Sequence, residues 1–113
     1  MDKITISWED FEKIALVTGT IVQVDDFPEA RIPAYKLLVD IGNGVIKKSS
    51  ARITDLYSKE ELVGKQVICV ANFPPKQIGR YQSELLVTGF YNDDGAVVLA
   101  VPDKAVKNGL KLA

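Results

Sequence analysis

Six cations in the middle of the chain form the cluster best suited to a chemical role, the binding of anions. Residues 36–80 carry eight Lys/Arg against four Asp/Glu (+4), whereas residues 1–35 carry three against seven (−4) and residues 81–113 carry three against four (−1). Binding phosphates through such cations releases counterions and makes affinity salt-dependent. The alternative is an ordinary solvated basic surface. The six cations are Lys36, Lys47, Lys48, Arg52, Lys76 and Arg80.

The residue types that most enzymes and metal sites need are scarce. The chain has no histidine, which is the usual general base and the commonest metal ligand. Its one cysteine, Cys69, lies in an apolar run over 67–71, which predicts a buried thiol and excludes an internal disulfide. The adjacent acid pairs at 25–26 and 93–94 lie in predicted turns without calcium-loop spacing. We expect no catalytic activity, no metal and no cofactor.

A proline-stiffened apolar corner offers a second kind of binding. The stretch over 71–89, ANFPPKQIGRYQSELLVTG, has two strand-like ends around a Pro-Pro pair. Phe73, Pro74 and Tyr81 could hold an extended peptide beside an open strand edge. The alternative is a rigid loop packed on its own domain. Phe27, a large apolar residue in a polar loop, either folds back onto the core or lines a binding surface.

Short strands must position these residues. Alternating apolar residues, β-branched residues and turn signals predict strands over 15–24, 35–41, 45–52, 66–72, 83–91 and 96–101. Gly19 inside the first strand suggests a bulge or a sharp bend. The sequences at 42–44 (GNG) and 92–95 (NDDG) are typical of hairpin turns, and 25–34 reads as a loop.

Two short helices complete the prediction. Ser58 with Glu61 fits a capping box between the third and fourth strands, and Gly64 ends that helix. A short helix at this place in a strongly bent β domain is the layout of an OB-fold. We therefore predict an all-β fold with short helices, a five-stranded OB-fold barrel. It forms one domain over 1–113.

The second helix begins after Ser7, near the N-terminus. Trp8, Phe11 and Ile14 share one face of it at helical spacing. That face either plugs the end of the barrel or meets a second subunit. The opening sequence MDKITISWED has no apolar signal region, and the apolar runs are too short to span a membrane. We expect a cytoplasmic protein without membrane insertion.

Three segments resemble the CsaA proteins, secretion-related chaperones built on the tRNA-binding OB domain. They are PEARIPAYKLLVDIG (28–42), KKSSARITDLYSKEELVGKQVICVANFPPKQIGRYQSELLVTGF (47–90) and PDKAVKNGLKL (102–112). The same domain occurs at the C-terminus of methionyl-tRNA synthetases and in EMAP-II-like proteins. The resemblance implies a homodimer, tRNA binding, and binding of unfolded or preprotein polypeptides for delivery to the ATPase SecA where the host has it.

The resemblance also implies particular positions. Many tRNA-binding relatives have Asp where this chain has Tyr35, and Gly-Met where it has Leu85-Leu86; the CsaA branch shares both differences. A monomer would expose apolar residues at its ends, which gives a reason to dimerise through Trp8, Phe11, Leu110 and Leu112. The positions that match the RNA-binding role are Lys36, Leu37, Lys47, Lys48, Ser49, Ser50, Asn72, Lys76, Gly79 and Ser83.

These observations leave two hypotheses. The first is a non-enzymatic, homodimeric chaperone that binds unfolded polypeptide at the apolar corner. The second is a tRNA-binding module that recognises RNA through the six cations, which we expect on one face of the barrel.

Overall fold

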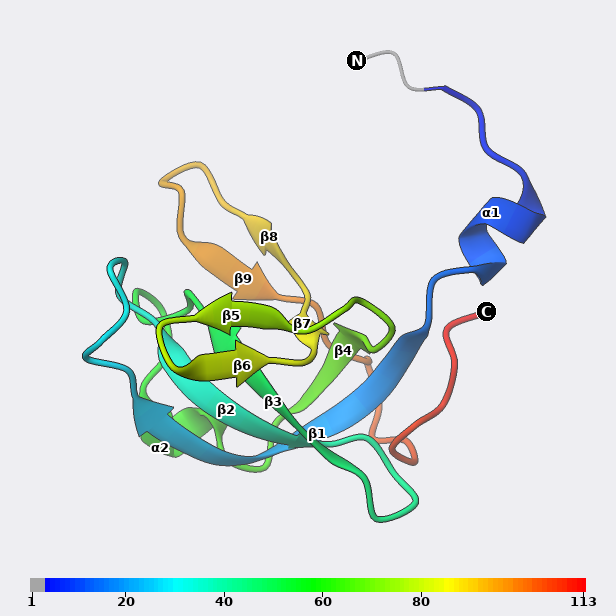
Figure 1. The fold of residues 1–113 in the computed structure, drawn as a ribbon. Coiled ribbons are helices and arrows are strands. Elements are labelled where there is room, and N and C mark those ends of the chain that lie inside the picture. The colour runs from blue at the N-terminus through cyan, green and yellow to red at the C-terminus, as the bar shows by residue number, and fades with distance from the viewer. Residues whose placement is uncertain (1–3) are drawn as a thin grey trace.

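The central element of the main sheet is an eleven-residue strand, β1 (Leu16–Asp26). The computed structural model describes residues 4–113. The sheet order is β3-β2-β1-β4-β7, and every pairing is antiparallel. Its other strands are β2 (Tyr35–Asp40), β3 (Ile46–Ala51), β4 (Gln66–Val70) and β7 (Leu86–Val87). Figure 1 shows this sheet curling into a small barrel, as the OB-fold prediction requires.

The barrel is closed by a mixture of backbone and side-chain hydrogen bonds rather than by a regular ladder. Glu84 donates its backbone N–H to the Lys48 carbonyl at 2.7 Å, and its carboxylate Oε1 accepts from the Lys48 N–H at 3.0 Å. The Ser50 N–H donates to Ser83 Oγ at 3.0 Å. These bonds occupy the edge of β3 next to the proline corner. Beside the proline corner, the strand β5 (Lys76–Ile78) pairs only with β6 (Tyr81–Ser83) among residues 4–113, so it keeps the open strand edge that the sequence predicts.

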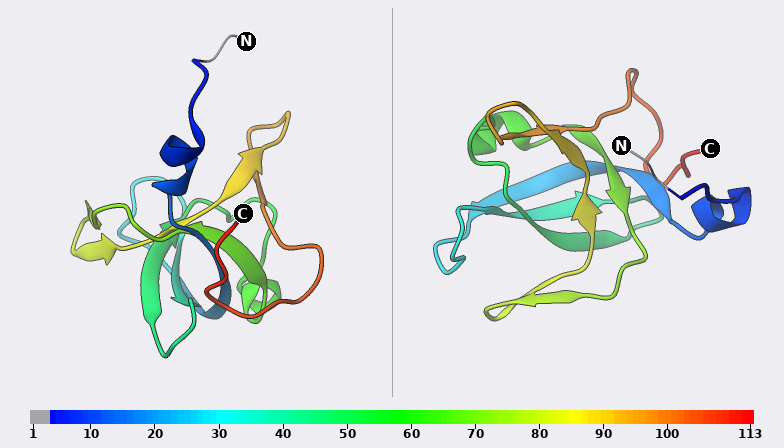
Figure 2. Two further views of the ribbon diagram at one scale, coloured as in Figure 1. Left: turned by 90° about the vertical axis from the view of Figure 1, so that its right-hand side faces the viewer. Right: turned by 90° about the horizontal axis from the view of Figure 1, so that it is seen from above.

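The two predicted helices are present and are capped as expected. The helix α2 (Lys59–Leu62) lies between β3 and β4, has the Ser58–Glu61 capping box and buries Leu62 completely. The helix α1 (Trp8–Glu12) has a capping box formed by Ser7 and Asp10 but buries none of its residues. Figure 2 shows α1 standing clear of the barrel. The interpretation that it plugs the barrel is therefore wrong.

Two hairpins project from the barrel in different directions (Figure 2). One consists of β5 (Lys76–Ile78) and β6 (Tyr81–Ser83), and the other of β8 (Gly89–Tyr91) and β9 (Val97–Leu99). The predicted strand over 83–91 is thus divided among β6, β7 and β8. The β5–β6 hairpin was predicted as a loop. Its sequence signal is Gly79, which has φ +59 at the first position of a two-residue turn.

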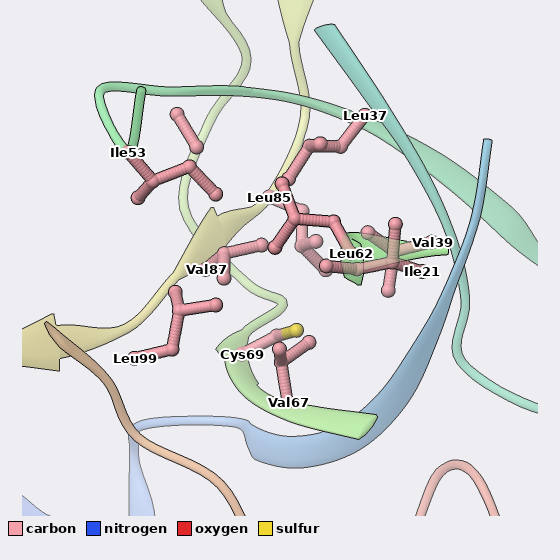
Figure 3. Close-up of a cluster of buried hydrophobic side chains, with 11 residues drawn as sticks. Ile21, Leu37, Val39, Ile53, Leu62, Val67, Cys69, Leu85, Val87 and Leu99 are labelled. Atoms are coloured by element: carbon pink, nitrogen blue, oxygen red, sulfur yellow. The ribbon is translucent and has the colours of Figure 1, made fainter. Parts of the chain in front are cut away.

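The core is a cluster of aliphatic side chains inside the barrel (Figure 3). Leu37 and Val39 of β2 are fully buried, as expected for alternate residues on the inner face of a strand. Cys69 is fully buried too, and this desolvation raises the pKa of its thiol to about 12. The prediction of a buried, unreactive cysteine is confirmed.

Gly19 serves a close approach of two strands rather than a bulge. It pairs with Val67 in regular register, and the irregularity of β1 lies between Ile21 and Gln23. A Cβ atom added at Gly19 would lie 2.7 Å from Val39 Cγ1, closer than real carbon contacts. The missing side chain therefore lets β1 pack tightly against β2.

The C-terminal tail pairs with the start of β1, along the edge that β2 leaves open. Thr18 donates its N–H to the Leu110 carbonyl at 3.0 Å, and Leu112 donates to the Leu16 carbonyl at 2.8 Å. The C-terminal tail and α1 consequently lie at the same end of the barrel (Figure 1). Among residues 4–113, no helix is long and apolar enough to cross a membrane.

Candidate functional site

A groove of about 780 Å³ is lined by residues of both hairpins. It contains the predicted peptide corner, Phe73 and Pro74, together with four residues predicted to bind nucleic acid. These four are Ser50, Arg52, Lys76 and Ser83. The two sets of residues, predicted for different ligands, therefore share one site.

Apolar side chains form most of the groove and remain open to solvent. Phe73 is 55% exposed, Leu86 46% and Tyr91 79%. Further apolar walls come from Ile78 of β5 and Val97 of β9. Sequence reasoning found Phe73 but missed Ile78, Leu86 and Tyr91. Ile78, Leu86 and Tyr91 belong to β5, β7 and β8 and line one groove only in the folded chain. No local sequence pattern predicts that these three strands share a groove.

The groove also carries positive charge without a compensating acid. Arg52 and Lys76 line it, and no Asp or Glu among residues 4–113 does so. Within the same residues, neither cation makes an ion pair. The groove therefore combines an apolar wall with two cations that are available to an anionic group.

A second basic site lies on the outer face of β2 and β3, around Tyr81. Lys36 Nζ lies 5.7 Å and Lys48 Nζ 5.3 Å from the centre of the Tyr81 ring. The Tyr81 hydroxyl reaches the carbonyls of Leu37 and Ser49, each at 3.4 Å. Burial, with smaller contributions from nearby acids, raises the pKa of Tyr81. We call Lys36, Lys48 and Tyr81 the basic face.

The structure does not place the six predicted cations on one face. Lys47 is paired with the core residue Val39, and paired residues share a face, so Lys47 lies opposite to Lys48. Arg80 occupies the exposed turn of the β5–β6 hairpin. The cations are thus divided between the basic face, the groove and two separate positions.

Several predicted polar contacts have structural roles. Ser49 is 1% exposed and donates its hydroxyl to the Leu85 carbonyl at 2.8 Å, so its prediction as a nucleic-acid contact is wrong. The Asn72 amide accepts from the Ala15 N–H at 2.9 Å and donates to the Lys13 carbonyl at 2.7 Å. That amide therefore fixes the linker between α1 and β1.

Phe27 folds back onto the protein. It is 5% exposed and makes an edge-on contact with Tyr81, with ring centres 5.3 Å apart. Lys36 Nζ lies 5.4 Å from its ring. The prediction of Phe27 as a peptide contact is therefore wrong. Tyr81 belongs to the basic face and does not line the groove.

The predicted dimer residues are solvent-accessible apolar groups at the terminal end of the barrel. Trp8 is 77% exposed and packs edge-on against Phe11, with ring centres 6.2 Å apart. Leu110 and Leu112 in the tail are 45% and 43% exposed. We call these four residues the terminal patch. They come from α1 and the C-terminal tail, which lie at the same end of the fold (Figure 1).

The barrel, its central short helix and the basic face define a small OB-fold domain, a class that binds extended polymers across its second and third strands. Residues 16–111 match a family model described as "Putative tRNA binding domain", and the chain belongs to this tRNA-binding domain family. Among residues 4–113, no group of three His, Cys, Asp or Glu side chains is placed to hold a metal ion.

Solved structures of two chaperones match nearly the whole chain. The chaperone CsaA from Bacillus anthracis is 41% identical with a TM-score of 0.91, covering 97% of this chain and 100% of its own. The CsaA chaperone protein from Picrophilus torridus is 47% identical with a TM-score of 0.90, covering 96% and 100%. The resemblance inferred from sequence is therefore confirmed.

Curated relatives include much longer enzymes. Methionine--tRNA ligase from Pyrococcus furiosus is 40% identical over 108 residues, which are 95% of this chain but 14% of the enzyme. The corresponding ligase from Methanocaldococcus jannaschii is 35% identical over 112 residues, 99% of this chain and 17% of the enzyme. The chain is thus similar to one short region of these ligases.

Proposed function

We propose that this chain is a non-catalytic, homodimeric chaperone that holds unfolded or preprotein polypeptide in its groove. The observation that carries the proposal is the exposed apolar wall formed by Phe73, Leu86 and Tyr91. A groove of about 780 Å³ is large enough to take bulky side chains of a polypeptide. The likeness to CsaA chaperones over nearly the whole chain supports the same function.

Dimerisation would cover the terminal patch. A five-residue helix is marginal in water without packing, and α1 buries none of its own residues. A second copy that packs on Trp8 and Leu112 would stabilise α1 and remove apolar surface from water. Light scattering at micromolar concentration is expected to give twice the 12.4 kDa chain mass. A 12.4 kDa species would contradict this part of the proposal.

The proposed setting is the cytoplasm. In a host with SecA, bound preproteins would pass to that ATPase, as the resemblance to CsaA implies. Co-sedimentation of the chain with SecA, with and without an unfolded preprotein, tests this step; failure of the preprotein to bring the two together would overturn it.

A second candidate function is tRNA binding, and the basic face favours it. Lys36 and Lys48 lie over one ring and, within residues 4–113, have no carboxylate in ion-pair range. Two such ammonium groups are suited to phosphate contacts. The family model that matches residues 16–111 supports this candidate.

A binding titration separates the two functions. Purified protein is titrated with bulk tRNA and with an unfolded polypeptide, at low and near-physiological salt. Polypeptide binding that survives salt and weakens in Phe73→Ala supports the chaperone function. Salt-sensitive tRNA binding that weakens in Lys48→Ala, without polypeptide binding, supports the RNA function. Lys107→Ala, an exposed tail lysine outside both sites, is the matched control.

A further inference from the structure

We propose that the groove selects polypeptide segments in which a large apolar side chain stands next to an acidic one, with Arg52 and Lys76 binding the carboxylate. This selectivity rests on the proposed chaperone function. The inference adds a preference for acidic residues in the bound segment, which the general binding of unfolded polypeptide does not require.

The first argument is charge complementarity. Arg52 and Lys76 line the groove from different elements, the end of β3 and the β5–β6 hairpin. Among residues 4–113, neither makes an ion pair and no acidic side chain lines the groove. A guanidinium presents paired donors that match a carboxylate, and an ammonium adds a second charge. Within residues 4–113, the lining therefore offers an incoming acid two cations and no competing carboxylate.

The second argument is the position of these cations beside apolar surface. Phe73 and Leu86 lie in the same groove, so a bound apolar side chain would displace water close to the charges. Electrostatic attraction strengthens where water is excluded. A segment that fills the apolar wall and places a carboxylate beside Arg52 would therefore gain from both contacts.

The third argument favours a polypeptide over RNA in this groove. Single-stranded nucleic acid needs a track of cations along its backbone and aromatic rings for successive bases. The groove offers two cations, and much of its wall is aliphatic, including Ile78, Leu86 and Val97. Lys36 and Lys48 do not line it.

The experiment compares short labelled peptides that differ in one residue. Gly/Ser peptides of equal length, amidated at the C-terminus, carry a central Phe-Asp, Phe-Asn or Phe-Lys, and binding is followed by fluorescence anisotropy. For the natural chain, we expect the Phe-Asp peptide to bind about tenfold more tightly than Phe-Asn, with Phe-Lys weakest.

The variants assign the preference to the two cations. In Arg52→Gln/Lys76→Gln, the Phe-Asp and Phe-Asn peptides should bind with equal affinity. In Arg52→Glu/Lys76→Glu, the Phe-Lys peptide should bind best. Lys107→Gln is the control and should keep the original preference.

Each of the other outcomes would contradict either the charge selectivity, the chaperone function or the assignment of the groove to polypeptide. Equal binding of all three peptides by the natural chain overturns the charge selectivity and leaves the chaperone function standing. Failure of every peptide to bind overturns the chaperone function itself. If an RNA oligonucleotide binds, no peptide does, and the RNA binding requires Arg52 and Lys76, the groove is a nucleic-acid site. Conversion of a dimer to a monomer by the charge reversal would make the groove an interface between copies.

Discussion

The basic face and the groove each contain two cations, but their surroundings differ. Lys36 and Lys48 on the basic face lie over the Tyr81 ring of their own chain. Arg52 and Lys76 in the groove stand beside exposed apolar residues and, within residues 4–113, have no ion-pair partner. The Tyr81 ring restricts the positions of the Lys36 and Lys48 ammonium groups. Within the same residues, Arg52 and Lys76 have no such contact and can bind a ligand. Local packing, rather than charge count, therefore distinguishes the two sites.

The largest effect should come from removing the ring on which the basic face is built. Tyr81→Ala is expected to lower the free energy of unfolding by about 2 kcal/mol, because the half-buried ring packs against Phe27. Weaker tRNA binding should accompany it. Chemical denaturation measures the stability, and the rate of Cys69 thiol labelling reports loosening of the core.

Tyr81→Phe is the control for this change, since it keeps the ring and removes only the hydroxyl. It should retain the lysine contacts and most of the stability. If Tyr81→Ala left stability and tRNA affinity at their original values, the ring would not organise the basic face.

The next largest effect should fall on the groove alone. Phe73→Ala is expected to weaken binding of unfolded polypeptide about tenfold, because exposed aromatic anchors contribute strongly to recognition. Its stability should change little, since the side chain is 55% exposed. Suppression of client aggregation and denaturation curves measure the two quantities. Undiminished protection by a dimeric Phe73→Ala protein would remove this residue from the site.

A smaller effect should follow from removing one charge of the basic face. Lys48→Ala is expected to lower tRNA affinity a few-fold and to reduce the salt dependence of binding by about one unit of slope. Peptide affinity in the groove should stay unchanged. Filter binding at several salt concentrations measures the slope, and a slope equal to that of the natural chain would exclude a phosphate contact.

The smallest effect should come from Lys47. Its place opposite the basic face predicts that Lys47→Ala leaves tRNA and peptide affinities within experimental error. The same titrations measure both. A loss of tRNA affinity as large as that of Lys48→Ala would mean that RNA contacts both faces of β3. The tRNA site would then not be confined to the basic face.

Local signals predicted the parts of the fold that depend on neighbours in sequence. The capping boxes at Ser7 and Ser58 and the inward phase of Leu37 and Val39 follow from residues within a few positions. The face of Lys47 could have been obtained from the same alternation, because it shares parity with the buried Ser49. The count of six cations on one face ignored that alternation.

The rest depends on contacts between distant segments. No periodicity indicates that Ser83 and Glu84 would occupy the edge of β3, about 35 residues earlier in the chain. The same holds for Asn72, whose amide bonds to the backbone of Lys13 and Ala15. The groove lies between segments brought together by barrel closure, so its full lining could not be assembled from sequence.

The Asn72 amide has a consequence for communication between the two ends of the molecule. It holds the linker that carries α1, and the next residue, Phe73, begins the groove wall. A second copy that packs against α1 would therefore act on Asn72, which is the residue next to the groove residue Phe73. Subunit pairing and client binding would then be linked through this hydrogen-bonded amide, and any effect of one on the other would be reciprocal. Asn72→Ala would remove both hydrogen bonds, and client affinity would then be the same for the monomer and the dimer.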